Sequence, residues 1–221
     1  MDGAAAMYER MHAYLSSAGI DGVKVDGQSS LGQCGQGLGG GAAICKRFIS
    51  ALENSVKRHF RSSNCIVCMS HANECLFNYR HSVVCRASDD FMPDDRASQA
   101  AHIAHCAYNG LFLSEITIPD WDMFHSKHPS GKLHGAARAV SGAAVYVSDH
   151  PGEHDWDLLK RIVTPDGKTL TCDGPARPTR DCLFCDPQTD ATSALKVFNT
   201  NASGGLGVVG CFNVQGAIWD R

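Results

Sequence analysis

The chain has 221 residues, of which 43% are hydrophobic and 19% are charged, so it has the composition of a globular protein and enough length to bury a core. The formal net charge of -3 indicates neither a nucleic acid nor an anionic membrane as a partner, and no apolar run is long enough to span a bilayer. The first residues do not have the pattern of a signal peptide, so the eleven cysteines are expected to be reduced thiols in a cytoplasmic protein.

Helices and strands are predicted to alternate along the first part of the chain. Apolar residues at a spacing of four, such as Ile44, Phe48 and Leu52, indicate amphipathic helices. Short apolar runs indicate strands, and their alternation with helices predicts parallel strands in an α/β fold. The predicted strands are 20–26, 65–71, 82–88, 111–118 and 144–149, and the predicted helices lie around 7–18, 44–60, 96–109, 132–140 and 155–163.

The pattern changes after Pro165. Strand-like runs at 169–172, 194–198 and 207–212 follow one another without helices between them. Residues 165–221 are therefore predicted to begin a second, antiparallel β domain.

Several short motifs are interpreted as structural, so neither a metal nor a cofactor is predicted. Gly35–Gly40 fits the pattern GxGxxG, but it does not open directly from a strand, which favours a flexible loop over a nucleotide site. Cys65–Cys68 and Cys182–Cys185 lie far apart in the chain and do not have the spacing of a zinc ribbon. Two histidine pairs lack the acid of an HExxH helix and are interpreted as surface or packing residues, namely His102 with His105 and His125 with His128.

Polar residues lie at or just after the end of each predicted strand. In (β/α) barrels and doubly wound sheets, the carboxyl ends of the strands form the active-site face, so acids there indicate either a metal site or paired carboxylates. Capping of the following helices accounts for some of these acids. They are Asp26 at the end of the first strand, Ser70 and His71 at the end of the second, Asp89 and Asp90 after the third, Asp120, Trp121 and Asp122 after the fourth, and Ser148 and Asp149 at the end of the fifth.

Lys24 and Asp26 lie on one face of the first strand, because side chains alternate along a strand. They are either a structural ion pair or partners of a polar ligand. Carboxylates near a tryptophan, without a metal motif, favour glycoside chemistry, in which one carboxylate attacks the anomeric carbon and the other protonates the leaving oxygen. Trp121 either stacks on a sugar ring or belongs to the core.

Longer segments carry a family resemblance. The chain resembles the plant and algal raffinose synthase and seed imbibition (alkaline α-galactosidase) proteins of glycoside hydrolase family 36. The resemblance covers the chain from about Met7 to its end and depends on segments that occur in the family's order. These segments are DGVKVD at 21–26, CMSH at 68–71, RASDDFMP at 86–93, PDWDMFHSKH at 119–128, VYVSD at 145–149 and RPTRDCLF at 177–184.

The resemblance implies a retaining mechanism on a (β/α)8 TIM barrel. The family's nucleophile is the aspartate of its KxD motif, which is Asp26 here, and its acid/base closes an RxSxD segment, which is Asp90 here. Asp26 would form a β-galactosyl-enzyme, and Asp90 would protonate the departing group and then deprotonate the acceptor. Residues from the same segments are expected to bind substrate, namely Lys24, Arg86, Asp122, Trp121 and His71.

Two departures from the family stand out. Family members are several-fold longer, so residues 1–164 would form about strands four to eight of the barrel, and residues 165–221 would begin a C-terminal β-sandwich-like domain. Gly27 stands where the family has a larger residue, and it is expected to loosen the loop without touching a catalytic group.

The implied activity is transfer of α-galactose from galactinol to sucrose, with this chain as a fragment of a longer enzyme. Hydrolysis of raffinose-family oligosaccharides by an alkaline α-galactosidase uses the same residues and stays open, as does an inactive fragment.

Overall fold

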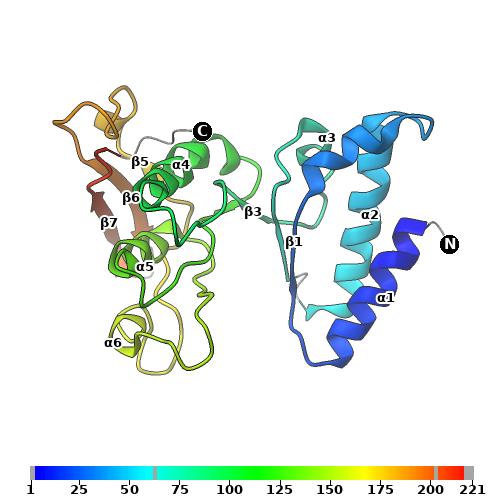
Figure 1. The fold of residues 1–221 in the computed structure, drawn as a ribbon, viewed down its shortest axis with the longest axis horizontal. Coiled ribbons are helices and arrows are strands. Elements are labelled where there is room, and N and C mark those ends of the chain that lie inside the picture. Colours follow the sequence, from blue (N-terminus) through cyan, green and yellow to red (C-terminus); the bar gives the residue numbers. More distant parts are fainter. Residues whose placement is uncertain (1–2, 62–63, 202–203, 217–221) are drawn as a thin grey trace. The chain divides into compact units, whose positions relative to one another are not determined.

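The computed structural model describes residues 3–61, 64–201 and 204–216. The chain is mixed α/β and falls into two compact units, Met1–Arg86 and Ala87–Arg221 (Figure 1). Among the described residues, no helix combines the length and the apolar character needed to cross a bilayer.

The first unit packs two long helices against short parallel strands. Tyr8, Leu52 and Val56 bury their side chains on Val67 and its strand neighbours in one apolar cluster. The spacing of Leu52 and Val56 on their helix is the amphipathic pattern that predicts such packing. The elements are α1 (Gly3–Ser17), β1 (Val23–Val25), a 3-10 helix η1 (Gln28–Gly35), α2 (Gly41–His59), β2 (Cys65–Val67), α3 (Asn73–Leu76) and β3 (Val84–Arg86).

The register of the strands determines which residues follow them side by side. Val25 pairs with Val67 across β1 and β2, and Val67 pairs with Cys85 across β2 and β3, all in parallel. Continuing this register by one residue brings Asp26, Cys68 and Arg86 to the carboxyl end of the three strands. The Cys68 N–H donates to the Val25 carbonyl at 2.8 Å, which fixes this row.

The second unit packs two helices on an antiparallel sheet of order β5-β6-β7. Apolar residues from α4, α5, β6 and β7 form one buried cluster, in which Ile103 and Val140 meet Leu195 and Phe212. The antiparallel sheet therefore shares its core with the helices that precede it. The elements are α4 (Ser98–Leu113), β4 (Ile118–Asp120), α5 (Gly131–Ser141), α6 (Trp156–Leu159), β5 (Arg177–Pro178), a 3-10 helix η3 (Arg180–Cys182), β6 (Leu195–Asn201) and β7 (Leu206–Phe212).

The strand predicted at 111–118 is wrong over most of its length. Helix α4 continues through Gly110 to Leu113, and β4 begins only at Ile118. Gly110 does not end the helix; a Cβ there would lie 3.1 Å from the Ala176 carbonyl, so the missing side chain permits close packing. By contrast, the predicted stop at Gly142 is confirmed, because this residue ends α5 with a φ of 74°.

The predicted fifth parallel strand is reduced to one bridge, in which Val147 pairs with Phe124. The helix predicted at 155–163 is shortened to α6, whose N-cap Asp155 accepts the Leu158 N–H at 3.0 Å. The mixed α/β class is confirmed, and so are the antiparallel strands predicted at 194–198 and 207–212, which are β6 and β7. The strand predicted at 169–172 is wrong, because only Thr169 forms a bridge there, with Val163. The partial barrel and the domain boundary after residue 164 stay predictions.

Candidate functional site

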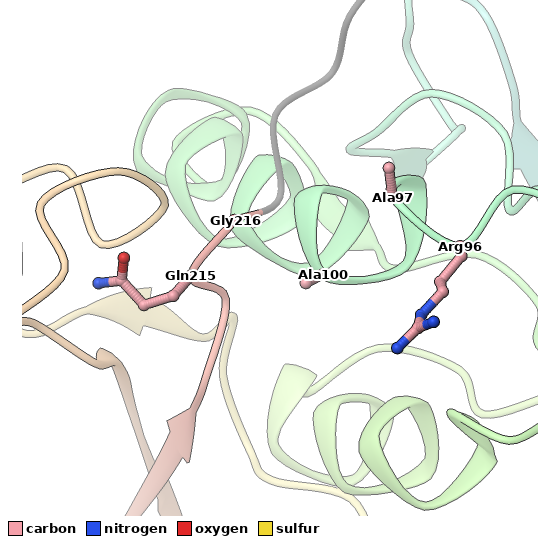
Figure 2. Close-up of a pocket in the computed structure, with 5 residues that line it drawn as sticks. All are labelled: Arg96, Ala97, Ala100, Gln215 and Gly216. Atoms are coloured by element: carbon pink, nitrogen blue, oxygen red, sulfur yellow. The ribbon is translucent and has the colours of Figure 1, made fainter.

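The hollow drawn in Figure 2 has a volume of about 370 Å³ and lies in the second unit. Arg96 and Ala97 approach it from the start of α4, and Gln215 and Gly216 from the segment after β7. Its lining contains none of the predicted site residues. Among the described residues, no group of three or more His, Cys, Asp or Glu side chains is placed to hold a metal ion. The strand ends are therefore the starting point for the site.

Asp26 follows β1 directly, and its side chain is exposed. Its Oδ1 accepts the N–H of Gly27 at 2.6 Å, and its backbone carbonyl accepts the Gln28 side-chain amide at 2.9 Å. Gly27 has a φ of 71°, the left-handed conformation that suits glycine. The expectation that Gly27 touches no catalytic candidate is therefore wrong, since its N–H holds the Asp26 carboxylate.

Charged side chains gather around the buried thiol of Cys68 in the first unit. Burial raises the pKa of Cys68 to about 12; the Arg86 and Lys24 cations lower it, and the Asp26 carboxylate raises it. Because these electrostatic effects act over short distances, the three predicted site residues lie near one thiol at the end of the strands. Lys24 is exposed, whereas Arg86 is buried. The first unit thus brings two cations and one carboxylate together.

His71 lies at the same end of the sheet as Arg86. Its Nε2 makes a short hydrogen bond with the Arg86 carbonyl. Next to it, Ser70 Oγ is 3.3 Å from Cys85 Sγ, a second contact between the segment after β2 and strand β3. These contacts place the His71 ring beside the backbone of Arg86.

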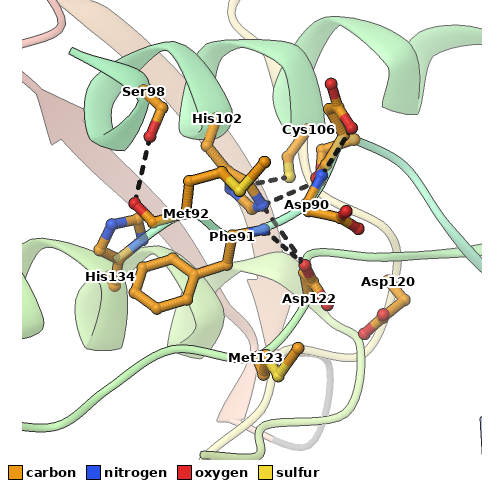
Figure 3. Close-up of polar contacts among 12 residues, drawn as sticks. Asp90, Phe91, Met92, Ser98, His102, Cys106, Asp120, Asp122, Met123 and His134 are labelled. Atoms are coloured by element: carbon orange, nitrogen blue, oxygen red, sulfur yellow. Dashed lines mark hydrogen bonds and ion pairs between the residues drawn. The ribbon is translucent and has the colours of Figure 1, made fainter. Parts of the chain in front are cut away.

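Asp90 lies in a segment whose backbone is held by neighbouring side chains in the second unit (Figure 3). Asp89 Oδ1 accepts the Asp90 N–H at 2.9 Å, and Asp122 Oδ2 accepts the Phe91 N–H at 2.9 Å. The Asp90 side chain itself is half-buried. Its backbone is thus fixed while its carboxylate keeps partial access to solvent.

Asp122 is fully buried and has a φ of 67°, which is uncommon for a residue other than glycine. Arg138 Nε donates to the Asp122 carbonyl at 3.1 Å, and His102 Nε2 lies 3.8 Å from Asp122 Oδ2. Nearby, Asp120 Oδ2 accepts the hydroxyl of Tyr146 at 2.7 Å, and burial together with this carboxylate raises the pKa of Tyr146. The Asp122 carboxylate is therefore engaged with the segment that carries Asp90.

Trp121 is fully buried in the cluster shared by α4, α5 and the antiparallel sheet. Its Nε1 has no hydrogen-bond partner among the described residues. Of the two alternatives for Trp121, this position favours the core residue over the sugar-stacking residue.

The sequence did not indicate that Arg138 and His134, which lie beside the Asp122 segment, belong to the site. Buried Arg138 donates from Nε to the Asp122 carbonyl, from Nη2 to the Met123 carbonyl at 3.0 Å and from Nη1 to His134 Nδ1 at 2.7 Å. His134 Nε2 in turn lies 2.8 Å from Gln99 Oε1. A usable signal is the spacing of four between polar residues on otherwise apolar helices, as in His134 and Arg138.

Comparison with known proteins identifies the family. The model of the family described as raffinose synthase or seed imbibition protein Sip1 matches residues 2–221. The chain is 50% identical over 212 residues to probable galactinol–sucrose galactosyltransferase 6 of Arabidopsis thaliana, a match that covers 96% of this chain and 28% of the relative. It is 42% identical over 222 residues to the galactinol–sucrose galactosyltransferase of Pisum sativum, covering 96% of this chain and 28% of the relative.

A third relative carries a different name. The chain is 40% identical over 223 residues to the stachyose synthase of Pisum sativum, covering 97% of this chain and 26% of that protein. The chain therefore spans little more than a quarter of the length of these relatives. Because the family match extends over nearly the whole sequence, the chain belongs to the raffinose synthase and seed imbibition protein family.

Proposed function

We propose that this chain supplies both catalytic carboxylates of a retaining galactosyltransferase that moves α-galactose from galactinol to sucrose. Asp26 is the nucleophile and Asp90 the general acid/base. Family membership and the names of the relatives support the reaction, which belongs to the complete protein because the chain spans about 28% of the first relative. The parallel strands are proposed to be part of a (β/α)8 barrel of glycoside hydrolase family 36.

The observation that carries the proposal is the exposed Asp26 carboxylate at the carboxyl end of a parallel strand, in a setting with Lys24 and Arg86. The carboxyl ends of parallel strands are where catalytic residues of barrel enzymes lie. A carboxylate nucleophile has to reach the anomeric carbon, and exposure permits this. Lys24 and Arg86 provide donors for sugar hydroxyls, and His71 lies beside Arg86.

The chemistry has two steps. Asp26 attacks the anomeric carbon of galactinol, and the bond to the inositol oxygen breaks as Asp90 gives that oxygen its proton. The product is a β-galactosyl-enzyme and free inositol. A sucrose hydroxyl then gives its proton to Asp90 and attacks the same carbon, which releases Asp26 and restores the α configuration in raffinose. Such a mechanism requires the two carboxyl groups to be about 5–5.5 Å apart.

The residues predicted to bind substrate lie in different surroundings. Lys24 and Arg86 lie with Asp26 in the first unit. The carboxylate of Asp122 is buried and accepts the Phe91 N–H, so support for a direct sugar contact is weaker there. Trp121 is least supported because its ring is fully buried.

The first test supplies galactinol and sucrose to this chain and to a segment-exchange protein, in which it replaces the matching part of the Arabidopsis relative. Raffinose made by the segment-exchange protein is the expected product. Free galactose without raffinose would overturn transfer and support hydrolysis. Raffinose from the exchanged protein but not from the isolated chain would show that the residues here need the rest of the enzyme.

The second test assigns the two carboxylates by stereochemistry. In the protein that transfers galactose, Asp26→Gly is expected to lower kcat by roughly 10⁴-fold or more, and Asp90→Gly by roughly 10²–10⁴-fold. With an aryl α-galactoside and azide, Asp26→Gly should form the β-azide, because azide replaces the nucleophile, and Asp90→Gly the α-azide, because azide replaces the acceptor. Asp21→Asn, an exposed acid before the same strand, is the control and should stay active. The opposite stereochemistry would reverse the assignment.

A further inference from the structure

A buried chain of hydrogen bonds runs from α4 into the segment that carries Asp90. His102 and Cys106 lie one helical turn apart and are 2% and 0% exposed. Cys106 Sγ is 3.7 Å from His102 Nδ1, and His102 Nε2 is 2.9 Å from Ser88 Oγ. Ser88 Oγ donates onward to the Asp89 carbonyl at 2.8 Å. Figure 3 shows His102 between Cys106 and the Asp90 segment.

The order of donors in this chain follows from the number of protons available. The hydroxyl of Ser88 has one proton and gives it to the Asp89 carbonyl, so its oxygen accepts from His102. His102 therefore carries a proton on Nε2, and its Nδ1 lies 3.7 Å from the Cys106 thiol. Burial raises the pKa of Cys106 to about 12, which keeps this thiol protonated as a donor. The contacts thus assign Nε2 of His102 as the donor to Ser88.

The other end of the Asp90 segment is held by Asp122. Its Oδ2 accepts the Phe91 N–H at 2.9 Å and lies 3.8 Å from His102 Nε2. His102 accordingly faces both anchors of the segment, Ser88 on the side before Asp90 and Asp122 on the side after it. The proton on Nε2 is directed toward Ser88 Oγ, and the Asp122 carboxylate lies farther from the same nitrogen.

We infer that His102 is a positioning residue for the general acid/base. It holds Ser88 by a hydrogen bond and lies beside Asp122, and these two residues fix the backbone on both sides of Asp90; His102 does not contact substrate. The inference rests on the proposed role of Asp90. A general acid transfers its proton only within hydrogen-bond reach of the leaving oxygen, and a misplacement of about 1 Å costs up to about 10²-fold in rate.

The kinetic test compares leaving groups in the protein that transfers galactose. Departure of inositol from galactinol needs protonation, whereas 4-nitrophenolate leaves from an aryl galactoside with little help. His102→Leu is expected to lower kcat for galactinol about 10-fold to 10²-fold more than kcat for the aryl galactoside, with KM little changed. His102→Gln places an amide N–H near the position of Nε2 and should restore most of the difference. Equal losses for both substrates would overturn the inference.

Two controls separate this inference from the proposed function. Asp90→Asn should show the same preference for the aryl galactoside; without it, the acid/base role of Asp90 fails. If Asp90→Asn shows the preference and His102→Leu does not, only the positioning role fails. Tyr108→Phe removes another hydrogen bond of α4, from the Tyr108 hydroxyl to the Cys182 carbonyl at 2.7 Å, and should affect both substrates equally.

A spectroscopic test needs no activity and uses the 221-residue chain. Correlation of ring protons with ring nitrogens should show a proton on Nε2 of His102. His102→Leu should speed amide hydrogen exchange at Asp90 and Phe91 roughly 10-fold or more, and leave β6 unchanged. An Nε2 without a proton, or unchanged exchange at these two amides, would contradict the positioning role.

Discussion

The two candidate carboxylates are held in different ways within their own units. Asp26 is exposed, and its carboxylate accepts the N–H of the next residue, Gly27, and lies beside the buried thiol of Cys68. Asp90 is half-buried, and the residues around it bind His102 and Asp122, which are both buried. A turn therefore positions the proposed nucleophile, whereas a network of buried side chains positions the proposed acid/base. The second arrangement depends on many distant residues, so it is the more sensitive to substitution.

A buried charged side chain anchors backbone in each unit. Glu53 on α2 accepts the N–H groups of Arg80, His81 and Ser82 at 2.8 to 3.1 Å, just before β3. Arg138 on α5 donates to two carbonyls and to His134. Glu53 holds the loop that precedes β3, while Arg138 holds the segment after β4 and also binds His134. Substitutions of Arg138 and Glu53 are therefore expected to cost different amounts of stability.

Arg138→Met should give the largest loss of stability. Removing the guanidinium leaves buried acceptors at the Asp122 and Met123 carbonyls and takes a positive charge away from the buried Asp120 and Asp122 carboxylates. Leaving a buried charge without its partner costs about 3–5 kcal/mol. Glu53→Gln keeps one acceptor oxygen for the loop and should cost about 1–3 kcal/mol. Urea unfolding followed by circular dichroism measures both. If Arg138→Met costs no more than Glu53→Gln, the dependence of the second unit on its buried polar network is refuted.

The pH dependence of stability is a second test of the buried polar network in the second unit. Burial and the positive charge of Arg138 lower the pKa of His134 to about 2. The unfolded chain takes up this proton below a pKa near 6.5, but the folded chain does so only near the lowered value. Stability is therefore fully present above pH 6.5 and is lost as pH falls toward the folded pKa. His134 should contribute a loss of about 2 kcal/mol between pH 7 and pH 5.

The matched variant for this measurement is His134→Gln, which cannot take up a proton and keeps an amide that can donate to Gln99. Burial also lowers the pKa values of His12 and His105, so the variant should retain part of the slope. The difference between the two unfolding curves across pH 5–7 isolates His134. Parallel curves would show that the site is protonated in the folded protein.

Local sequence patterns predicted some of the helices correctly. Helix α2 and the end of α5 at Gly142 follow from apolar periodicity and from a glycine with positive φ. Strands of three residues, such as β1 and β4, contain too few positions to separate a strand from the last turn of a helix. The predicted helix at 96–109 therefore ends earlier than α4 does. Whether Gly110 stops a helix or packs closely depends on Ala176, which is distant in sequence.

Some residues of the candidate site could likewise be predicted from the sequence and others could not. Asp26 and Asp90 could be identified from their position after strands and from the family resemblance, because both signals are local in sequence. The role of His102 could not, since it depends on simultaneous contacts with Ser88, Cys106 and Asp122. A histidine pattern on a helix does not indicate which partners the fold supplies.

The smallest expected effect tests the turn at Asp26. Gly27 has a φ of 71°, and a Cβ there would meet no atom within 4 Å, so backbone strain alone opposes a side chain. Gly27→Ala should therefore lower the unfolding free energy by only about 1 kcal/mol, and Gly27→Asn by less, because asparagine tolerates this conformation. Urea unfolding of the three proteins gives the ranking.

Because the Gly27 N–H holds the Asp26 carboxylate, Gly27→Ala should reduce galactosyl transfer more than its loss of stability alone would, while Gly27→Asn should preserve both transfer and stability. If alanine leaves transfer and stability unchanged, the turn is not what positions Asp26, and the contrast between the two carboxylates would have to rest on Lys24 and Arg86 instead.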